Sequence, residues 1–91
     1  MSHLIKNKQK LLARVRRLKG QIEAIERSLE AEAPCGNTLN LVASVRGAFN
    51  GLTAELIEEH IREHISAPEQ DMKAREQGAA ELIEVVKRYL K

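Results

Sequence analysis

Apolar residues recur at steps of three and four along the first third of the chain, the spacing of an α-helix that packs lengthwise against another helix. These residues are Leu11, Val15, Leu18, Ile22, Ile25 and Leu29. The pattern predicts a helix from about residue 5 to residue 32. Pro34 follows, and proline disfavours helical geometry at the residue before it and donates no backbone hydrogen bond, so we expect the helix to end ahead of it.

A second apolar stripe with the same spacing predicts a long helix from about residue 36 to residue 65. Its members are Val42, Val45, Phe49, Leu52 and Leu56. The opposite side carries Ala43, Gly47 and Gly51 at intervals of four. Glycine lowers helix propensity but lets another backbone approach closely. Either the same chain or another subunit can supply that backbone, and the sequence leaves both open.

A third, shorter helix is predicted from about residue 71 to residue 90, after an interruption at Ser66, Ala67 and Pro68. Gly78 weakens its first half. The 91 residues include only one phenylalanine and one tyrosine, so a core of Leu, Ile, Val and Ala is expected, which suits helix-on-helix packing. The fold class predicted is therefore all-α, a single domain of two long antiparallel helices and a short C-terminal helix.

The two long helices also predict self-association. Helices of about 30 residues span roughly 45 Å, and a lone hairpin of that length leaves much of its apolar stripe in water. Pairing two hairpins into a four-helix bundle dimer removes that exposure.

Positive charge is concentrated at one end of the chain, although the net charge is only +2. Residues 1–20 hold no acid, and their basic residues are Lys6, Lys8, Lys10, Arg14, Arg16, Arg17 and Lys19. Such asymmetry suggests a polyanion on one surface. Lys10, Arg14, Arg17 and Gln21 share one helix face, and such a stripe can clamp DNA phosphates. A merely solvated basic face is the alternative.

Cysteine usage and hydropathy point to the cytoplasm. No apolar run approaches the roughly 18 residues that span a bilayer, and no secretory signal is apparent. The single cysteine, Cys35, cannot form an intrachain disulfide. In a reducing compartment an isolated thiol is expected to be a metal ligand or reactive group rather than inert packing.

His60 and His64 lie four residues apart on a predicted helix, so their rings project from one face at a spacing that can hold one metal ion. Alone, such a pair is equally typical of a solvated helix end. Cys35 precedes His60 by 25 residues on the same helix, a separation of roughly 37 Å. One chain cannot bring them together, but two antiparallel copies of the helix can. The site predicted is therefore intersubunit and present twice per dimer.

His3 is a fourth candidate ligand, although a lone histidine at that position is usually a tail residue. Removal of the initiator methionine would leave the Ser2 amine beside it. Thiolate, imidazoles and an amine form a mixed nitrogen and sulfur set that suits Ni(II), Co(II) or Zn(II) better than Mg(II) or Ca(II).

These residues together resemble the family of copper-sensing and nickel/cobalt-sensing repressors, with its formaldehyde-sensing branch, over essentially the whole chain. The segments that carry the resemblance are residues 13–21 (ARVRRLKGQ), Cys35, residues 45–52 (VRGAFNGL) and residues 59–64 (EHIREH). The resemblance implies three-helix protomers, dimers assembled into a flat tetramer, and repressors rather than enzymes that leave operator DNA when the inducer binds. It makes Arg14 and Arg17 the first candidates for DNA contact, followed by Arg16, Lys10 and Arg46.

The branch depends on few positions. His3, Cys35, His60 and His64 are similar to the nickel/cobalt branch, with control of a metal efflux gene as the expected role. A copper(I) sensor of the family would carry a second cysteine at position 64. The formaldehyde branch shares Cys35 and His60 but typically begins with proline, where this chain has Ser2. A formaldehyde-responsive repressor that uses Cys35 and the N-terminal amine stays open as the alternative.

Overall fold

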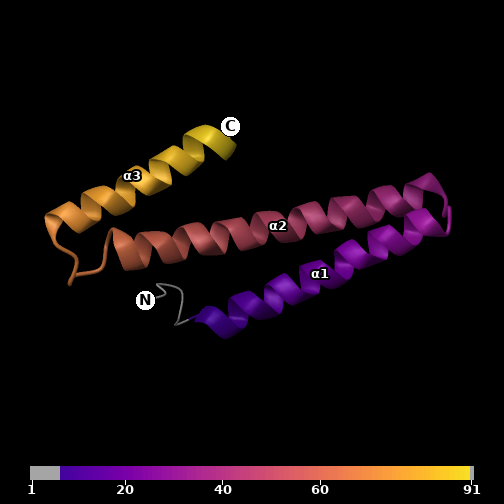
Figure 1. Cartoon of the computed structure of the whole chain (residues 1–91), viewed down its shortest axis with the longest axis horizontal. Coiled ribbons are helices and arrows are strands. Elements are labelled where there is room, and N and C mark those ends of the chain that lie inside the picture. Colours follow the sequence, from indigo (N-terminus) through magenta and orange to yellow (C-terminus); the bar gives the residue numbers. More distant parts are fainter. Residues whose placement is uncertain (1–6, 91) are drawn as a thin grey trace. The chain divides into compact units, whose positions relative to one another are not determined.

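The computed structural model describes residues 7–90, and this part of the chain contains three α-helices and no strand (Figure 1). The helices are α1 (Lys8–Glu30), α2 (Cys35–His64) and α3 (Met72–Tyr89). The all-α prediction and all three predicted helices are confirmed. No described helix combines the length and apolarity that crossing a membrane requires.

The described residues fall into two compact units, residues 7–53 and residues 54–90, and α2 contributes to both. The first unit holds α1 and the first part of α2. The second holds the rest of α2 and all of α3. That the chain functions as one repressor domain stays a prediction.

The end of α1 was predicted near residue 32 and lies at Glu30, because the chain leaves the helix before it reaches Pro34. Glu32 adopts a φ of 52°, in the left-handed region. The amide of Ala33 then donates to the Ser28 carbonyl oxygen at 3.0 Å, which closes a Schellman motif. Left-handed backbone geometry costs a non-glycine residue about 1–2 kcal/mol, so glutamate rarely adopts it. The glutamate at position 32 therefore did not indicate a helix end in the sequence.

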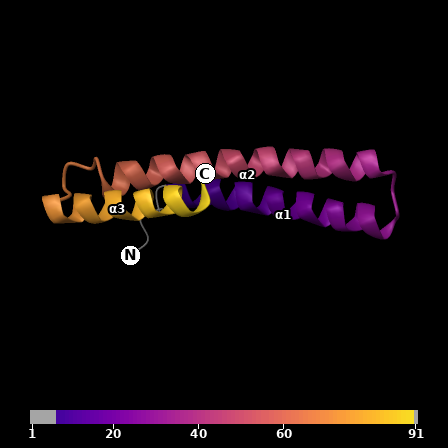
Figure 2. The ribbon, with the colours of Figure 1, turned by 90° about the horizontal axis from the view of Figure 1, so that it is seen from above.

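In the first unit, α1 and the first part of α2 run antiparallel, side by side in both views of the ribbon (Figures 1 and 2). Polar contacts between the two helices fix their register at increasing distance from the turn. They are Ser28 Oγ to Thr38 Oγ1 at 2.7 Å, Gln21 Nε2 to Ser44 Oγ at 3.5 Å, and Arg14 Nη1 to the Gly51 carbonyl oxygen at 3.3 Å. Residues 14, 21 and 28 therefore lie on the side of α1 that faces α2.

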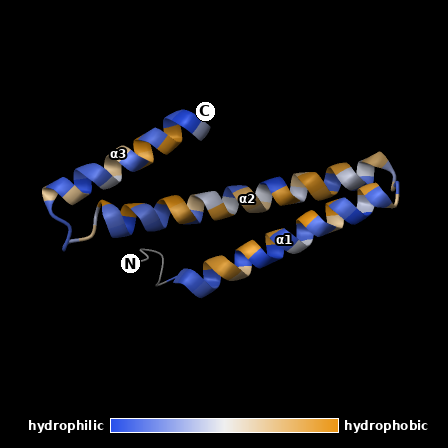
Figure 3. Cartoon of the chain, viewed as in Figure 1, coloured by the Kyte–Doolittle hydropathy of each residue, from blue (hydrophilic) through white to orange (hydrophobic). Residues whose placement is uncertain are grey.

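Each apolar stripe is only partly covered within one chain. Leu11, Leu18 and Val45 are buried, whereas the exposed fraction is 46% for Ile22 and 45% for Phe49. Figure 3 shows apolar residues spaced along both long helices. Burying apolar side chains contributes about 25 cal/mol per Å² of apolar surface, so association with a second copy that covers these residues would be favourable. The four-helix bundle dimer stays a prediction that this exposure favours.

In the second unit, α3 begins at a capping residue and packs against the end of α2. The Asp71 carboxylate accepts a hydrogen bond from the Ala74 amide at 2.7 Å, which satisfies a free donor of the first turn. Arg75 Nη2 donates to the carbonyl oxygen of the buried Ala67 at 3.3 Å. Gly78 is buried as well. The first half of α3 is therefore held by the loop that precedes it.

Candidate metal site and nucleic-acid interface

The last two turns of α2 bring His60 and His64 together. Their rings are stacked, with centroids 4.7 Å apart and planes inclined by 29°. This contact follows directly from the i, i+4 spacing on a helix. The prediction that both rings project from one face is confirmed, and two imidazoles at this spacing can ligate one metal ion.

The His60 ring is oriented by α3. Its Nε2 lies 2.8 Å from the Gly78 carbonyl oxygen and 3.8 Å from the Glu81 carboxylate. A carbonyl oxygen only accepts, so Nε2 donates, and in the neutral ring the lone pair is then on Nδ1. Carbonyl and carboxylate partners of this kind orient histidine ligands in many metal sites. Neither Gly78 nor Glu81 could be assigned to this site from the sequence, because their proximity to His60 depends on the loop between α2 and α3.

Gly78 allows α3 to approach this pair closely. A β-carbon at position 78 would lie 2.5 Å from the His64 carbonyl oxygen and 2.8 Å from the His64 Cβ. Contacts this short are not tolerated, so α3 could not pack here with a larger residue. The glycine that lowers helix propensity is thus the residue that places the Gly78 carbonyl oxygen at His60.

The other predicted ligands are not joined to this pair. Cys35 is the first residue of α2, carries a free thiol and is exposed, whereas the histidines lie at the other end of the same helix. Within residues 7–90, no three side chains of His, Cys, Asp or Glu are grouped so as to hold a metal ion. His3 and Ser2 lie outside the described residues. The four-ligand set remains a prediction that needs a second subunit.

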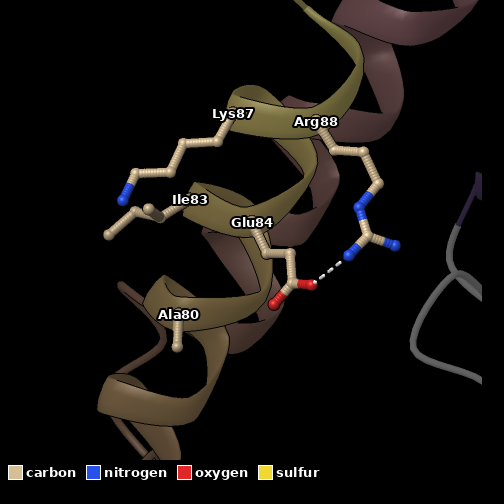
Figure 4. Close-up of a pocket in the computed structure, with 5 residues that line it drawn as sticks. All are labelled: Ala80, Ile83, Glu84, Lys87 and Arg88. Atoms are coloured by element: carbon tan, nitrogen blue, oxygen red, sulfur yellow. Dashed lines mark hydrogen bonds and ion pairs between the residues drawn. The ribbon is translucent and has the colours of Figure 1, made fainter.

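A pocket on α3 is a second place where a ligand could bind. Its lining residues are Ala80, Ile83, Glu84, Lys87 and Arg88 (Figure 4). The Glu84 carboxylate accepts from Arg88 Nη2 at 3.0 Å. One carboxylate already paired with a guanidinium gives no set of metal ligands.

Three of the four residues of the predicted basic stripe lie together on α1, and two of them, Arg14 and Gln21, contact α2. A role of this stripe in DNA binding stays a prediction. Arg14, Arg17 and Gln21 line one small cavity of about 50 Å³ together with Leu18 and Ala48. Arg17 is exposed, whereas the Arg14 side chain is half-buried. Arg16 and Lys10 are exposed on α1, and Arg46 is exposed on α2. The first turn of α1 holds no acidic residue.

Comparison with known proteins identifies relatives over the whole chain. Residues 7–88 match the family model described as metal-sensitive transcriptional repressor. A Serratia marcescens protein described as an uncharacterized protein in the bioA 5′ region is 48% identical over 91 residues, 100% of both chains. The transcriptional repressor RcnR of Citrobacter koseri is 38% identical over 91 residues, again 100% of both chains.

A solved structure is similar as well. It is a glutamate-to-histidine variant of the formaldehyde-responsive regulator FrmR of Salmonella enterica serovar Typhimurium. Identity is 40%, the TM-score is 0.86, and the match covers 92% of this chain and 94% of that one. The matched family consists of transcriptional repressors rather than enzymes, as expected from the sequence. The chain therefore belongs to the metal-sensitive transcriptional repressor family.

Proposed function

We propose that this chain is a cytoplasmic repressor that binds operator DNA without metal and leaves it when Ni(II) or Co(II) binds, with a metal efflux gene as its target. The observation that carries the proposal is the stacked pair of His60 and His64, whose rings are 4.7 Å apart. Histidine at position 64 favours nickel, cobalt or zinc over the soft, thiolate-rich site that copper(I) prefers.

The remaining ligands would come from a second copy of the chain. In an antiparallel pairing of α2, Cys35 of one subunit meets His60 and His64 of the other, and the N-terminal segment adds His3 and the Ser2 amine. Two such dimers form the tetramer that the family resemblance implies. The exposure of Cys35 and of residues along the α1 and α2 stripes supports this arrangement.

DNA binding would fall to the basic face of α1. Arg14 and Arg17 are the principal contacts, with Arg16, Lys10 and Arg46 as further contacts. Arginine suits this role because its planar guanidinium can donate two hydrogen bonds to one phosphate. Several neutralised phosphates would make the affinity fall steeply with salt.

Release requires that the inducer bind one conformation of the repressor better than the other. Ligands drawn from α2 of one subunit and from the N-terminal segment and Cys35 of another would shift α1 when they converge. A coupling free energy of about 1–3 kcal/mol is typical of such linkage. A bound metal ion would supply the positive charge that the Cys35 thiolate and the imidazoles of His60 and His64 share as ligands.

Formaldehyde release is the second candidate. The similarity to the formaldehyde-responsive regulator and the exposed Cys35 thiol favour it. The N-terminal amine and the Cys35 thiol would condense with one formaldehyde to form an N–CH2–S bridge, with loss of one water. In this mechanism Cys35 is a nucleophile rather than a ligand.

Fluorescence anisotropy distinguishes the two functions. A labelled duplex from upstream of the chain's own coding sequence is bound by reduced, metal-free protein, and each candidate inducer is then added. Release by Ni(II) or Co(II), with a thiolate charge-transfer band in the absorption spectrum, is the expected result. Release by formaldehyde alone would instead assign the protein to the aldehyde branch, and the protein mass should then rise by one carbon atom, because one CH2O is added and one water is lost. If the protein binds no DNA duplex even at low salt, both proposed repressor functions are wrong.

Metal affinity is expected to fall on acidification. Thiol and imidazole ligands must lose their protons before they bind, so protons compete with the metal for Cys35, His60 and His64. Competition titrations with a chelator of known affinity, at pH 7.5 and pH 6 as roughly neutral and mildly acidic conditions, measure the effect. Equal affinities at both values would count against the proposed ligand set.

A further inference from the structure

Arg14 is held against α2 at a glycine. Its Nη1 donates to the Gly51 carbonyl oxygen at 3.3 Å, across the antiparallel pair of helices. A carbonyl oxygen has two lone pairs, so one that accepts from its own helix can accept a second donor where the backbone is accessible. Gly51 provides that access because it has no side chain.

The space over Gly51 is filled by the guanidinium itself. A β-carbon at position 51 would lie 2.9 Å from Arg14 Nη2 and 3.7 Å from Arg14 Cζ. The nearest atoms belong to the far end of a flexible side chain, so alanine at this position would displace the guanidinium and leave the two helices in place.

Gly47 shows that this contact is particular to position 51. It lies one helical turn earlier on the same side of α2, yet a β-carbon there would meet nothing within 4 Å. Both glycines carry the same helix-propensity cost relative to alanine. Of these two glycines, only Gly51 has a neighbour in the space that a β-carbon would take, and that neighbour is the Arg14 guanidinium.

We propose that Gly51 is a positioning residue for DNA binding, because its bare backbone holds the Arg14 guanidinium beside Arg17 in the orientation that meets phosphate. The proposal rests on the proposed function, in which Arg14 contacts DNA. Arg14 and Arg17 line the same cavity, so fixing one sets the spacing of the pair. A side chain ordered before binding loses less rotamer freedom when the DNA arrives.

The test compares Gly51→Ala with Gly47→Ala in the full chain. We expect Gly51→Ala to weaken duplex binding about 3- to 10-fold, the size of one rotamer-rich side chain that must be ordered on binding. Its melting temperature should equal or exceed that of the unaltered protein, because alanine favours the helix. Gly47→Ala should gain the same stability and keep its affinity. Anisotropy over a series of salt concentrations and thermal unfolding provide both readouts.

Arg14→Ala separates the possible failures. If Arg14→Ala leaves affinity and salt dependence unchanged, the proposed DNA contact is wrong. In a second outcome, Arg14→Ala weakens DNA binding but Gly51→Ala binds DNA at least as tightly as Gly47→Ala. The contact between Arg14 and DNA is then supported, and the positioning role of Gly51 is overturned. In the Arg14→Ala background, Gly51→Ala should have no further effect, and an additive loss would also overturn the proposal. Arg14→Lys keeps the positive charge but lacks the planar guanidinium, so it should lose about as much duplex affinity as Gly51→Ala. This variant keeps Gly51, so its result does not depend on whether the Gly51→Ala protein folds.

Discussion

Replacing Cys35 with alanine is expected to abolish release from DNA while leaving the operator affinity of the metal-free protein unchanged. Cys35 is exposed at the first residue of α2, so its loss should remove a ligand without disturbing packing. Outer-shell changes alone weaken metal binding by about 10- to 100-fold, and loss of a ligand should exceed that. The anisotropy assay with added Ni(II) or Co(II) measures the effect.

His64→Leu distinguishes the two candidate inducers. It removes a ligand from the stacked pair, so release by nickel or cobalt should be lost. The methylene bridge needs only Cys35 and an amine, so release by formaldehyde should survive. Asn40→Ala alters an exposed polar residue of the same helix and should keep both DNA binding and release. If Cys35→Ala or His64→Leu loses DNA binding instead, the separation of inducer site from DNA face is wrong.

The helices could be predicted because each carries an apolar stripe of helical period, and the position of Pro34 limits the first one. The exact end of α1 could not be predicted, because it depends on the left-handed conformation of Glu32, which glutamate rarely adopts. The start of α3 was predicted within one residue, at a point where Asp71 is a favourable capping residue.

The candidate site was predictable where it depends on one helix alone. His60 and His64 needed only their spacing of four residues, and the face shared by Arg14, Arg17 and Gln21 needed only the helical period. Contacts between helices were not predictable. Whether Gly51 or Gly47 meets an arginine depends on the register of the hairpin, which the turn at residues 31–34 sets.

Gly78→Ala is expected to destabilise the protein, against the usual effect of replacing a helical glycine with alanine. The added β-carbon would lie 2.5 Å from the His64 carbonyl oxygen, and a backbone atom cannot move aside as the end of a side chain can. Overpacking typically costs about 1–3 kcal/mol, and a clash with backbone belongs in the upper part of that range, above the roughly 1 kcal/mol gained in helix propensity. Thermal unfolding at one fixed protein concentration is the measurement, because association makes the melting temperature concentration-dependent.

Gly20→Ala is the matched control, since a β-carbon there meets nothing within 4 Å. Gly20→Ala should raise the melting temperature, and Gly78→Ala should lower it. In a chain of this size, each kcal/mol of change in the free energy of unfolding shifts the melting temperature by about 4–8 °C. A Gly78→Ala protein as stable as the Gly20→Ala protein would mean that α3 is not packed on the α2 backbone. Displacement of α3 would also lengthen the 2.8 Å contact between His60 Nε2 and the Gly78 carbonyl oxygen. The folded Gly78→Ala protein should therefore bind nickel more weakly while its metal-free form keeps its DNA affinity, because the oriented ring belongs to the inducer site and the basic face belongs to α1.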